Sequence, residues 1–179
     1  KEACGRMYGR HTDISVYRSM VFNKPAKMGS DLPWHQDGGD WWALDRDPLF
    51  FVWTALDPAT KENGCVKVVP ETHKLGILSK RGHTLSAAKI NELQIEQKAV
   101  DVEVGEGESV LMHNWLVHSS GTNPSDIPRR AFSVNFCDGR TRVLDPKPVV
   151  QPENISAKLG KEGQLFPLIF NQKNELSMF

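Results

Sequence analysis

His35 and Asp37 are the first residues of the chain whose types and spacing suggest chemistry. They lie one residue apart in the stretch WHQDGGDWW, which begins at Trp34. In an extended strand, alternate side chains point to the same face, so an imidazole and a carboxylate would project together here. Two ligands hold a metal ion poorly, however. The pattern therefore predicts half of a metal site, to be completed by a residue from elsewhere in the chain.

The histidines that could complete this site are distant in the sequence. His11, His73 and His83 are interpreted as local residues, because they stand near the start of the chain or in turns and loops. His113 ends an apolar strand. His118 follows WLV, where a strand leaves a sheet for a loop, and ligands are often held at such places on a rigid scaffold. The residues alone do not choose between these two.

The expected ligand set is two imidazoles and one carboxylate. With open positions on the metal, that set suits non-haem Fe(II), which binds a cosubstrate and oxygen. Zinc accepts the same ligands, as it does in metallohydrolases. The ligand types therefore leave the metal open at this point.

The composition excludes several classes of partner. The chain has 179 residues, enough for one domain with an ordinary core, and Lys+Arg and Asp+Glu are both 22, so no net field attracts nucleic acid or an anionic membrane. No apolar run approaches the roughly 20 residues of a membrane span, and the first residues lack the apolar segment of a signal peptide. The three cysteines form no CxxC pair, which favours a reducing compartment. We therefore predict a cytoplasmic protein without nucleic-acid or membrane partners.

Short strands dominate the secondary structure that the sequence predicts. The segments are rich in Val, Phe and Trp and are bounded by Gly, Pro, Asn and Asp. They cover residues 14–22, 49–56, 65–70, 99–104, 109–114 and 131–136. VDVEV followed by GEGE predicts a hairpin from 100 to 113. Many short strands favour an antiparallel sandwich or barrel over an α/β fold.

One helix and a C-terminal tail complete the expected organisation. TLSAAKINELQIEQ, residues 84–97, has apolar residues at helical spacing, with Thr84 or Ser86 as its cap. Residues 139–179 are rich in Pro and polar residues, and we expect them to wrap the outside of a single domain, 1–179, with one short helix near 153–159. The chain begins with Lys, which suggests that N-terminal elements are missing.

Further evidence for a metal site comes from Arg129, which begins the strand that follows HSSGTNPSDIP. The chain contains, in this order, His-x-Asp, a distant His that opens an H-x-S-G-x-N loop, and an Arg. In this order of motifs the chain resembles the phytanoyl-CoA dioxygenase family of Fe(II)/2-oxoglutarate oxygenases. The segments WTALDPATKENGCVKVVPETHKLG and GESVLMHNWLVHSSG also look like this family. The resemblance covers roughly residues 14 to 138, and it implies a double-stranded β-helix, or cupin-like jelly roll, which agrees with a mostly-β fold with a few flanking helices.

The resemblance also implies roles for individual residues. His35, Asp37 and His118 would be the iron ligands, and Arg129 would form a salt bridge with the distal carboxylate of 2-oxoglutarate, which the planar fork of a guanidinium suits. Arg130 competes for that role, but a strand alternates faces, so only one of the two can point inward. The spacing favours Arg129, and we expect Arg130 to be solvated. Further residues match family positions near the cosubstrate or the iron: Ser120, Trp53 and Lys24. The first two are equally interpretable as a turn hydroxyl and a core indole.

The activity that the resemblance implies is a hydroxylation. Fe(II), 2-oxoglutarate and O2 would together oxidise an unactivated C–H bond of a small-molecule metabolite, with release of succinate and CO2. Related halogenases replace the carboxylate ligand by a small residue, whereas this chain keeps Asp37. Trp41 and Trp42 are expected to line an apolar substrate pocket, and Trp34 less so. Gly38 and Gly39 would let the chain turn sharply after the ligands.

Three alternatives remain at this stage. A cupin-like isomerase or binding module would use the same metal ligands without 2-oxoglutarate, and Arg129 counts against it. A zinc hydrolase would usually need a general base beside its metal-bound water, and no HExxH or GxSxG motif is present. A truncated, inactive copy is the third. The substrate is not readable, although scattered lysines and a C-terminal SMF, unlike the peroxisomal SKL, favour a small metabolite over a CoA ester.

Overall fold

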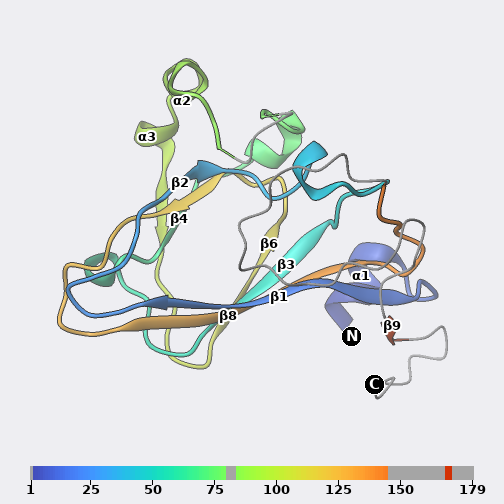
Figure 1. The fold of residues 1–179 in the computed structure, drawn as a ribbon, viewed down its shortest axis with the longest axis horizontal. Helices are drawn as coiled ribbons and strands as arrows, with labels where there is room; N and C mark the ends of the chain where they lie inside the picture. The colour runs from blue at the N-terminus through green and yellow to red at the C-terminus, as the bar shows by residue number, and fades with distance from the viewer. Residues whose placement is uncertain (1, 80–83, 145–167, 171–179) are drawn as a thin grey trace.

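The computed structural model describes residues 2–79, 84–144 and 168–170, and these form two antiparallel sheets (Figure 1). The larger sheet has the order β6 (Ser109–His113), β3 (Phe50–Ala55), β8 (Arg129–Asp138), β1 (Ile14–Lys24) and β9 (Leu168–Phe170). The smaller sheet has the order β2 (Leu32–His35), β7 (His118–Ser120), β4 (Val66–Val68) and β5 (Val100–Val102). The predicted mostly-β jelly roll is confirmed.

The helices among the described residues are short and lie outside the two sheets (Figure 1). They are α1 (Glu2–Tyr8), α2 (Ala87–Leu93) and α3 (Ile95–Lys98), together with 3-10 turns at Asp40–Trp42, Lys61–Asn63 and Thr72–Leu75. None of the helices in the described part of the chain is long and apolar enough to span a bilayer.

β1 and β8 are the two longest strands of the larger sheet, and they pair with each other along their length. Its register runs from Ile14 opposite Asp138 to Lys24 opposite Arg129. The register shifts between Val16 and Arg18, so β1 carries one extra residue at this point. A bulge of this kind re-aims the side chains that follow it. Arg18 and the alternate residues after it consequently point into the space between the sheets.

The predicted hairpin from 100 to 113 is wrong, although both of its strands exist. β5 pairs with β4 in the smaller sheet, whereas β6 pairs with β3 in the larger one. The turn is present, because the Glu108 amide donates to the Gly105 carbonyl at 3.1 Å. It carries the chain from one sheet to the other. The local alternation predicts two strands and a turn, but the apolar faces of both strands are buried between the sheets, and this favours the crossover.

The core that fills the space between the sheets is continuous across both of them. The larger sheet and the smaller sheet with its adjoining loops contribute to one cluster: Phe51, Trp53, Ala55, Ala59, Cys65, Val66, Val104, Met112 and Ala131. Burying these apolar side chains provides the main driving force that holds the sheets face to face. The rigid scaffold for the site is therefore the sandwich itself.

The predicted helix is present, but it is interrupted. The Ser86 hydroxyl accepts a hydrogen bond from the Lys89 amide at 3.3 Å, so Ser86 rather than Thr84 is the N-cap. Gln94 has a φ of 55° and separates α2 from α3. Ile95, which is fully buried, packs with Trp34 and Leu85. The segment therefore covers the smaller sheet as two short helices instead of one.

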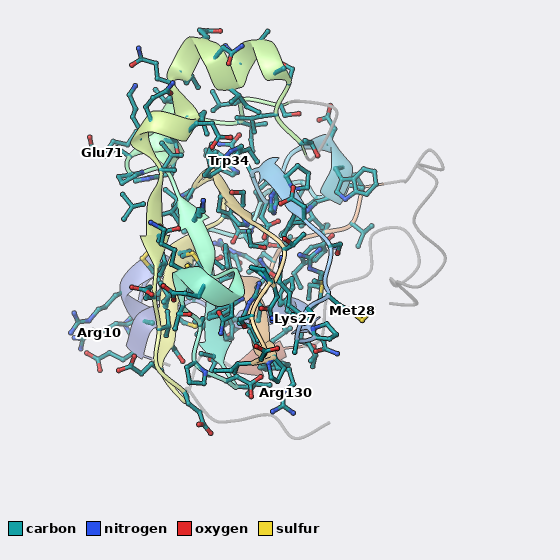
Figure 2. All side chains as sticks on the ribbon, turned by 90° about the vertical axis from the view of Figure 1, so that its left-hand side faces the viewer. Arg10, Lys27, Met28, Trp34, Glu71 and Arg130 are labelled. Atoms are coloured by element: carbon teal, nitrogen blue, oxygen red, sulfur yellow. The ribbon has the colours of Figure 1, made fainter. Side chains whose placement is uncertain are left out.

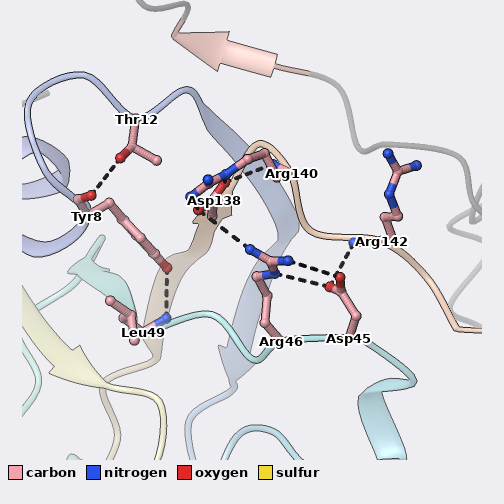
Figure 3. A network of polar contacts seen from close by, with 8 residues as sticks. All are labelled: Tyr8, Thr12, Asp45, Arg46, Leu49, Asp138, Arg140 and Arg142. Carbon is pink, nitrogen blue, oxygen red and sulfur yellow. Dashed lines mark hydrogen bonds and ion pairs between the residues drawn. The ribbon is translucent and has the colours of Figure 1, made fainter.

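The first residues of the predicted tail pair with the loop that contains Asp45 (Figure 3). The Arg142 amide donates to Asp45 at 3.0 Å, and the Asp45 amide donates to the Arg142 carbonyl at 3.1 Å. Arg46 lies between Asp45 and Asp138, at 3.2 Å and 3.9 Å respectively. β9 adds to the edge of β1. The expected helix near 153–159 falls outside the described residues, and the wrapping of the whole tail stays a prediction.

Candidate active site

The fold brings His35, Asp37 and His118 together. His35 ends β2 and His118 begins β7, and the two residues are directly opposite one another in the smaller sheet. Their ring centroids are 4.0 Å apart. One possible ligand atom from each of the three residues lies within 4.8 Å of the others, and all three residues are buried. This is the only cluster of three or more His, Cys, Asp or Glu residues with such spacing in the described part of the chain.

Both imidazoles are held in one tautomer by the backbone. Nδ1 of His35 lies 2.7 Å from the Pro33 carbonyl, and Nδ1 of His118 lies 2.8 Å from the Leu116 carbonyl. A carbonyl oxygen only accepts, so each Nδ1 must carry the proton. Each Nε2 then keeps its lone pair. A neutral imidazole that is oriented by a backbone carbonyl is a common form of metal ligand.

Asp37 is positioned by the loop that follows β2. Its amide donates to the Asn114 carbonyl at 2.8 Å. Gly38, which follows it, has a φ of 136°, and a Cβ at this position would lie 2.6 Å from Asp47 Oδ2. That oxygen accepts hydrogen bonds from the Gly39 amide at 2.8 Å and from Trp115 Nε1 at 2.9 Å. The glycine therefore permits a close approach to Asp47, which fixes the turn beside Asp37.

Gln36, between the two candidate ligands, holds the same strand from the other side. Its side-chain amide donates to the carbonyls of Gly76 and Trp115, at 2.9 Å and 2.6 Å. Its oxygen accepts from the Leu78 amide at 2.7 Å. Side chains alternate along an extended segment, so His35 and Asp37 face the space between the sheets while Gln36 ties their backbone to the neighbouring loops.

A cavity of about 240 Å³ opens beside the cluster. Residues from both sheets line it: Arg18, Met20, Phe22, Leu32, His35, Asp37, Trp41, Phe51, Trp53, Val66, Met112, His118, Ser119, Ser120, Arg129 and Ser133. Half of these side chains are apolar, and the polar half includes the three candidate ligands and Arg129. Apolar walls with a limited set of polar groups are typical of a site for a small molecule.

Arg129 projects into this cavity and is only 1% exposed. Its Nη2 donates to the Gly64 carbonyl at 2.9 Å, and its guanidinium carbon lies 5.6 Å from the centre of the Trp53 ring. Its Nε is buried, and no residue in the described part of the chain accepts a hydrogen bond from it. Burial lowers the pKa of this guanidinium from its ordinary value. A buried cation of this kind is costly unless something pairs with it.

Arg130, the neighbouring residue, points away from the cavity (Figure 2). Its side chain forms two hydrogen bonds with the carboxylate of Asp57, at 2.8 Å and 2.6 Å. This pairing lowers the pKa of the Asp57 carboxyl. Arg130 thus has a carboxylate of its own, whereas among the described residues none forms an ion pair with Arg129. The unpaired guanidinium and its free Nε fit one end of a dicarboxylate such as 2-oxoglutarate.

The other residues expected near the cosubstrate lie around Arg129. Trp53 and Ser120 are buried and line the cavity. Lys24 lies opposite Arg129 on β1, but it is not part of the cavity wall. Its Nζ donates to the carbonyls of Ser30, Ser120 and Gly121. Burial, and then the charge of Arg129, lowers the pKa of Lys24 to about 8.

The tryptophans expected around the pocket have different positions. Trp41 lines the cavity, but the structure does not place Trp42 in its wall. Trp42 is 3% exposed and packs on Tyr17, with ring centroids 4.6 Å apart. The turn at Asp40–Trp42 is a 3-10 helix, in which adjacent side chains point in directions about 120° apart. Trp34 lies under α2 and α3 (Figure 2), where its Nε1 donates to Glu96 at 2.6 Å.

The remaining histidines do not join the cluster. His73 and His113 pack against each other outside the cavity, with ring centroids 5.0 Å apart. Nδ1 of His113 accepts from the Trp115 amide at 3.0 Å, and burial and His73 both lower the His113 pKa. His11 is exposed, and His83 lies outside the described residues.

Arg18 is a cavity residue that the sequence reasoning missed. Its Nη2 lies 4.0 Å from Asp37 Oδ2. The available signal was Arg18 as the single charged residue of the strand ISVYRSMVF. Ser133 on β8 also lines the cavity and was missed.

Comparison with known proteins identifies the family of this chain. A family model described as Phytanoyl-CoA dioxygenase (PhyH) matches residues 3–131. The human protein "Phytanoyl-CoA dioxygenase, peroxisomal" is 31% identical over 157 residues, which are 82% of this chain and 46% of the human protein. A probable phytanoyl-CoA dioxygenase of Caenorhabditis elegans is 29% identical over 137 residues, which are 71% of this chain and 44% of that protein. The chain thus spans about half the length of these relatives.

Solved structures of non-heme enzymes are also similar to this chain. The non-heme monooxygenase ThoJ is 29% identical, with a TM-score of 0.63 over 78% of this chain and 52% of that chain. The non-heme alpha ketoglutarate dependent carbocyclase SnoK from nogalamycin biosynthesis is 25% identical, with a TM-score of 0.70 over 88% of this chain and 61% of that chain. Given the extent of the match to the family model, the chain belongs to the phytanoyl-CoA dioxygenase family.

Proposed function

We propose that this chain forms the catalytic core of an Fe(II)- and 2-oxoglutarate-dependent dioxygenase that hydroxylates an unactivated C–H bond of a small-molecule metabolite, releasing succinate and CO2. One observation carries this proposal. The cluster of His35, Asp37 and His118 and the buried, carboxylate-free guanidinium of Arg129 face the same cavity. Two imidazoles, a carboxylate and open positions suit Fe(II), and a buried guanidinium suits the far carboxylate of a dicarboxylate cosubstrate.

The chain's own residues would hold and orient the reactants. His35 and His118 offer Nε2, because backbone carbonyls hold their Nδ1 protons, and Asp37 offers its carboxylate. Bound Fe(II), with 2-oxoglutarate as reductant, supplies the activation of O2. Arg129 fixes the far end of the cosubstrate, and the Ser120 hydroxyl lies in the same cavity to share that carboxylate.

The remaining wall of the cavity excludes water from the reaction. Its larger apolar residues include Phe22, Phe51, Trp53 and Met112. A low-dielectric surrounding strengthens the pairing of Arg129 with a carboxylate and limits side reactions with solvent. The nearby charge of Lys24, buried behind Arg129, adds to the positive potential at this end of the cavity.

Two alternative chemistries receive less support from the site. A cupin-like isomerase or binding module would have no use for an arginine buried without a carboxylate. A zinc hydrolase needs a base beside the metal-bound water, but the residues that line the cavity include no carboxylate or imidazole beyond His35, Asp37 and His118. Asp37 itself favours hydroxylation over halogenation.

We also propose a reducing compartment such as the cytosol. Cys4, Cys65 and Cys137 are free thiols and are buried. Burial is the main cause that raises the pKa of Cys65 to about 11 and that of Cys137 to about 12, so neither thiol is reactive near neutral pH. Free, unreactive thiols are typical of proteins in a reducing compartment. The balanced charge supports the absence of a nucleic-acid partner.

The proposal is tested by following 2-oxoglutarate in the presence of Fe(II), ascorbate and O2. The wild type should convert 2-oxoglutarate to succinate, and Arg129→Met should do so only at far higher cosubstrate concentration. Arg130→Met is the matched control, because this neighbouring arginine points outward, and it should behave as the wild type. A folded, iron-loaded wild type that forms no succinate would contradict the proposal. An iron-dependent activity that is equal in the Arg129→Met variant would favour the cupin-like alternative.

A further inference from the structure

A second arginine, Arg18, faces the same cavity from another strand. It lies on β1 directly after the register shift, and it lines the cavity together with Met20 and Phe22. Its side chain is 22% exposed, so most of it is removed from water. The site thus contains two guanidinium groups, one on β1 and one on β8.

The Arg18 guanidinium is held in place before any ligand binds. Its central carbon lies 5.3 Å from the centre of the Trp42 ring. Trp42 is buried and packs in turn on Tyr17. A cation that is supported by an aromatic face loses little conformational freedom when it binds an anion. Trp42, which is absent from the cavity wall, therefore has a supporting role behind Arg18.

The hydrogen-bonding capacity of Arg18 is not used by the described residues. Its Nε is buried, and none of these residues accepts a hydrogen bond from it. The nearest carboxylate oxygen, Asp37 Oδ2, is 4.0 Å from Nη2, which is too long for a hydrogen bond. Asp37 also belongs to the candidate metal cluster, so a bound metal would share its negative charge. Arg18 thus keeps a positive charge and unused donors beside the apolar part of the cavity wall, which includes Met20 and Phe22.

We propose that Arg18 binds a carboxylate of the substrate, which makes the substrate a small carboxylic acid with an apolar body. This inference rests on the proposed function, because it assumes that Arg129 takes the cosubstrate. A guanidinium offers parallel donors that match a carboxylate. The apolar body would pack against Met20, Phe22 and Leu32, which line the same cavity. The cavity of about 240 Å³ would also hold the metal and the cosubstrate, so only a small acid would fit beside them.

The test measures binding to protein that is loaded with Zn(II) and saturated with 2-oxoglutarate, in which no turnover occurs. Hexanoate and octanoate are titrated calorimetrically, and hexanamide and octanamide serve as neutral probes of the same shape. The wild type should bind the acids at least ten-fold more tightly than the amides. Arg18→Met should lose this preference, Arg18→Lys should keep part of it, and Arg130→Met should keep all of it.

The possible outcomes separate the two proposals. A wild type with no preference for acids, or an Arg18→Met variant that keeps the preference, overturns the role of Arg18. If Arg18→Met weakens Zn(II) binding and leaves the preference intact, Arg18 only positions Asp37 and the inference is wrong. Failure to bind 2-oxoglutarate counts against the proposed function alone. In that case the titrations are repeated without cosubstrate, and the preference should be lost in Arg18→Met but kept in Arg130→Met.

Discussion

Replacing Arg129 by Met should leave the stability of the fold nearly unchanged, or raise it, but should weaken the binding of 2-oxoglutarate. Arg129 is 1% exposed, has an unpartnered Nε and forms no ion pair with a described residue. Its burial therefore costs several kcal/mol, which the bond to the Gly64 carbonyl and the stacking on Trp53 offset by about 1–3 and about 0.5–2 kcal/mol. Methionine fills similar space without the charge. The free energy of unfolding of the cosubstrate-free protein should hence change by less than about 1 kcal/mol, or rise.

The affinity for 2-oxoglutarate should fall sharply in the same variant. Removing one partner of a buried, hydrogen-bonded charge pair costs about 2–5 kcal/mol. At about 1.4 kcal/mol per ten-fold change, the dissociation constant should rise roughly thirty-fold to several-thousand-fold. This loss and the unchanged stability together distinguish an arginine kept for a ligand from one kept for the fold.

Urea unfolding of the cosubstrate-free protein measures the first quantity, and calorimetric titration of 2-oxoglutarate into Zn(II)-loaded protein measures the second. Arg130→Met is the control and should leave cosubstrate affinity as it is, since Arg130 is exposed and pairs with Asp57. A loss of more than about 3 kcal/mol of stability in Arg129→Met would refute the reasoning, because the arginine would then be structural. Unchanged cosubstrate affinity would refute it equally.

Three further perturbations test the supports of the site. Gly64→Ala should destabilise the protein by about 2 kcal/mol or more and weaken 2-oxoglutarate binding, because φ at Gly64 is +78° and the new Cβ would lie 2.6 Å from the Thr122 carbonyl oxygen. Gly107→Ala is the control: φ there is +80° but the surrounding space is open, so urea unfolding should show a loss of only about 1 kcal/mol. Lys24 has a pKa of about 8 in the folded protein, below its ordinary value, so the folded state binds fewer protons than the unfolded state. The free energy of unfolding of the wild type, relative to Lys24→Met, should therefore rise between about pH 8 and 10.5. A relative stability that does not change with pH would contradict this. Asp47→Ala removes the acceptor for the Gly39 amide and Trp115 and should weaken Zn(II) binding roughly ten-fold; unchanged affinity in a folded variant would show that this turn does not position Asp37.

The local spacing of residues was sufficient to predict two of the three candidate ligands, His35 and Asp37, because alternate side chains share a face in extended backbone. The same alternation predicts that only one of Arg129 and Arg130 points inward, and the spacing from His118 favoured Arg129. The pairing of distant residues was not contained in the spacing. His118 was separable from His113 only through the resemblance, since both stand at the ends of apolar strands. In the fold, His118 lies directly opposite His35 and joins the cluster with Asp37, whereas His113 does not.

The incorrect and missed predictions have physical causes beyond the local pattern. The hairpin from 100 to 113 failed because β5 and β6 bury their apolar faces from different sheets, which no local window contains. Arg18 was missed because a lone charged residue in a strand is most often exposed, and only the pairing of β1 with β8 shows that it faces the cavity. Trp41 and Trp42 were expected to act together, but the 3-10 turn sends them to different surroundings.

The most direct test of the central claim is an anaerobic titration. Fe(II) and then 2-oxoglutarate are added to the protein, and the weak visible charge-transfer band of the bound chelate is recorded for the wild type, His118→Ala and Arg129→Met. The cluster of His35, Asp37 and His118 predicts a band in the wild type, its loss in His118→Ala, and a band in Arg129→Met that needs far more cosubstrate. A folded wild type that gives no band, or a band that persists unchanged in His118→Ala, would contradict an iron and 2-oxoglutarate site in this cavity.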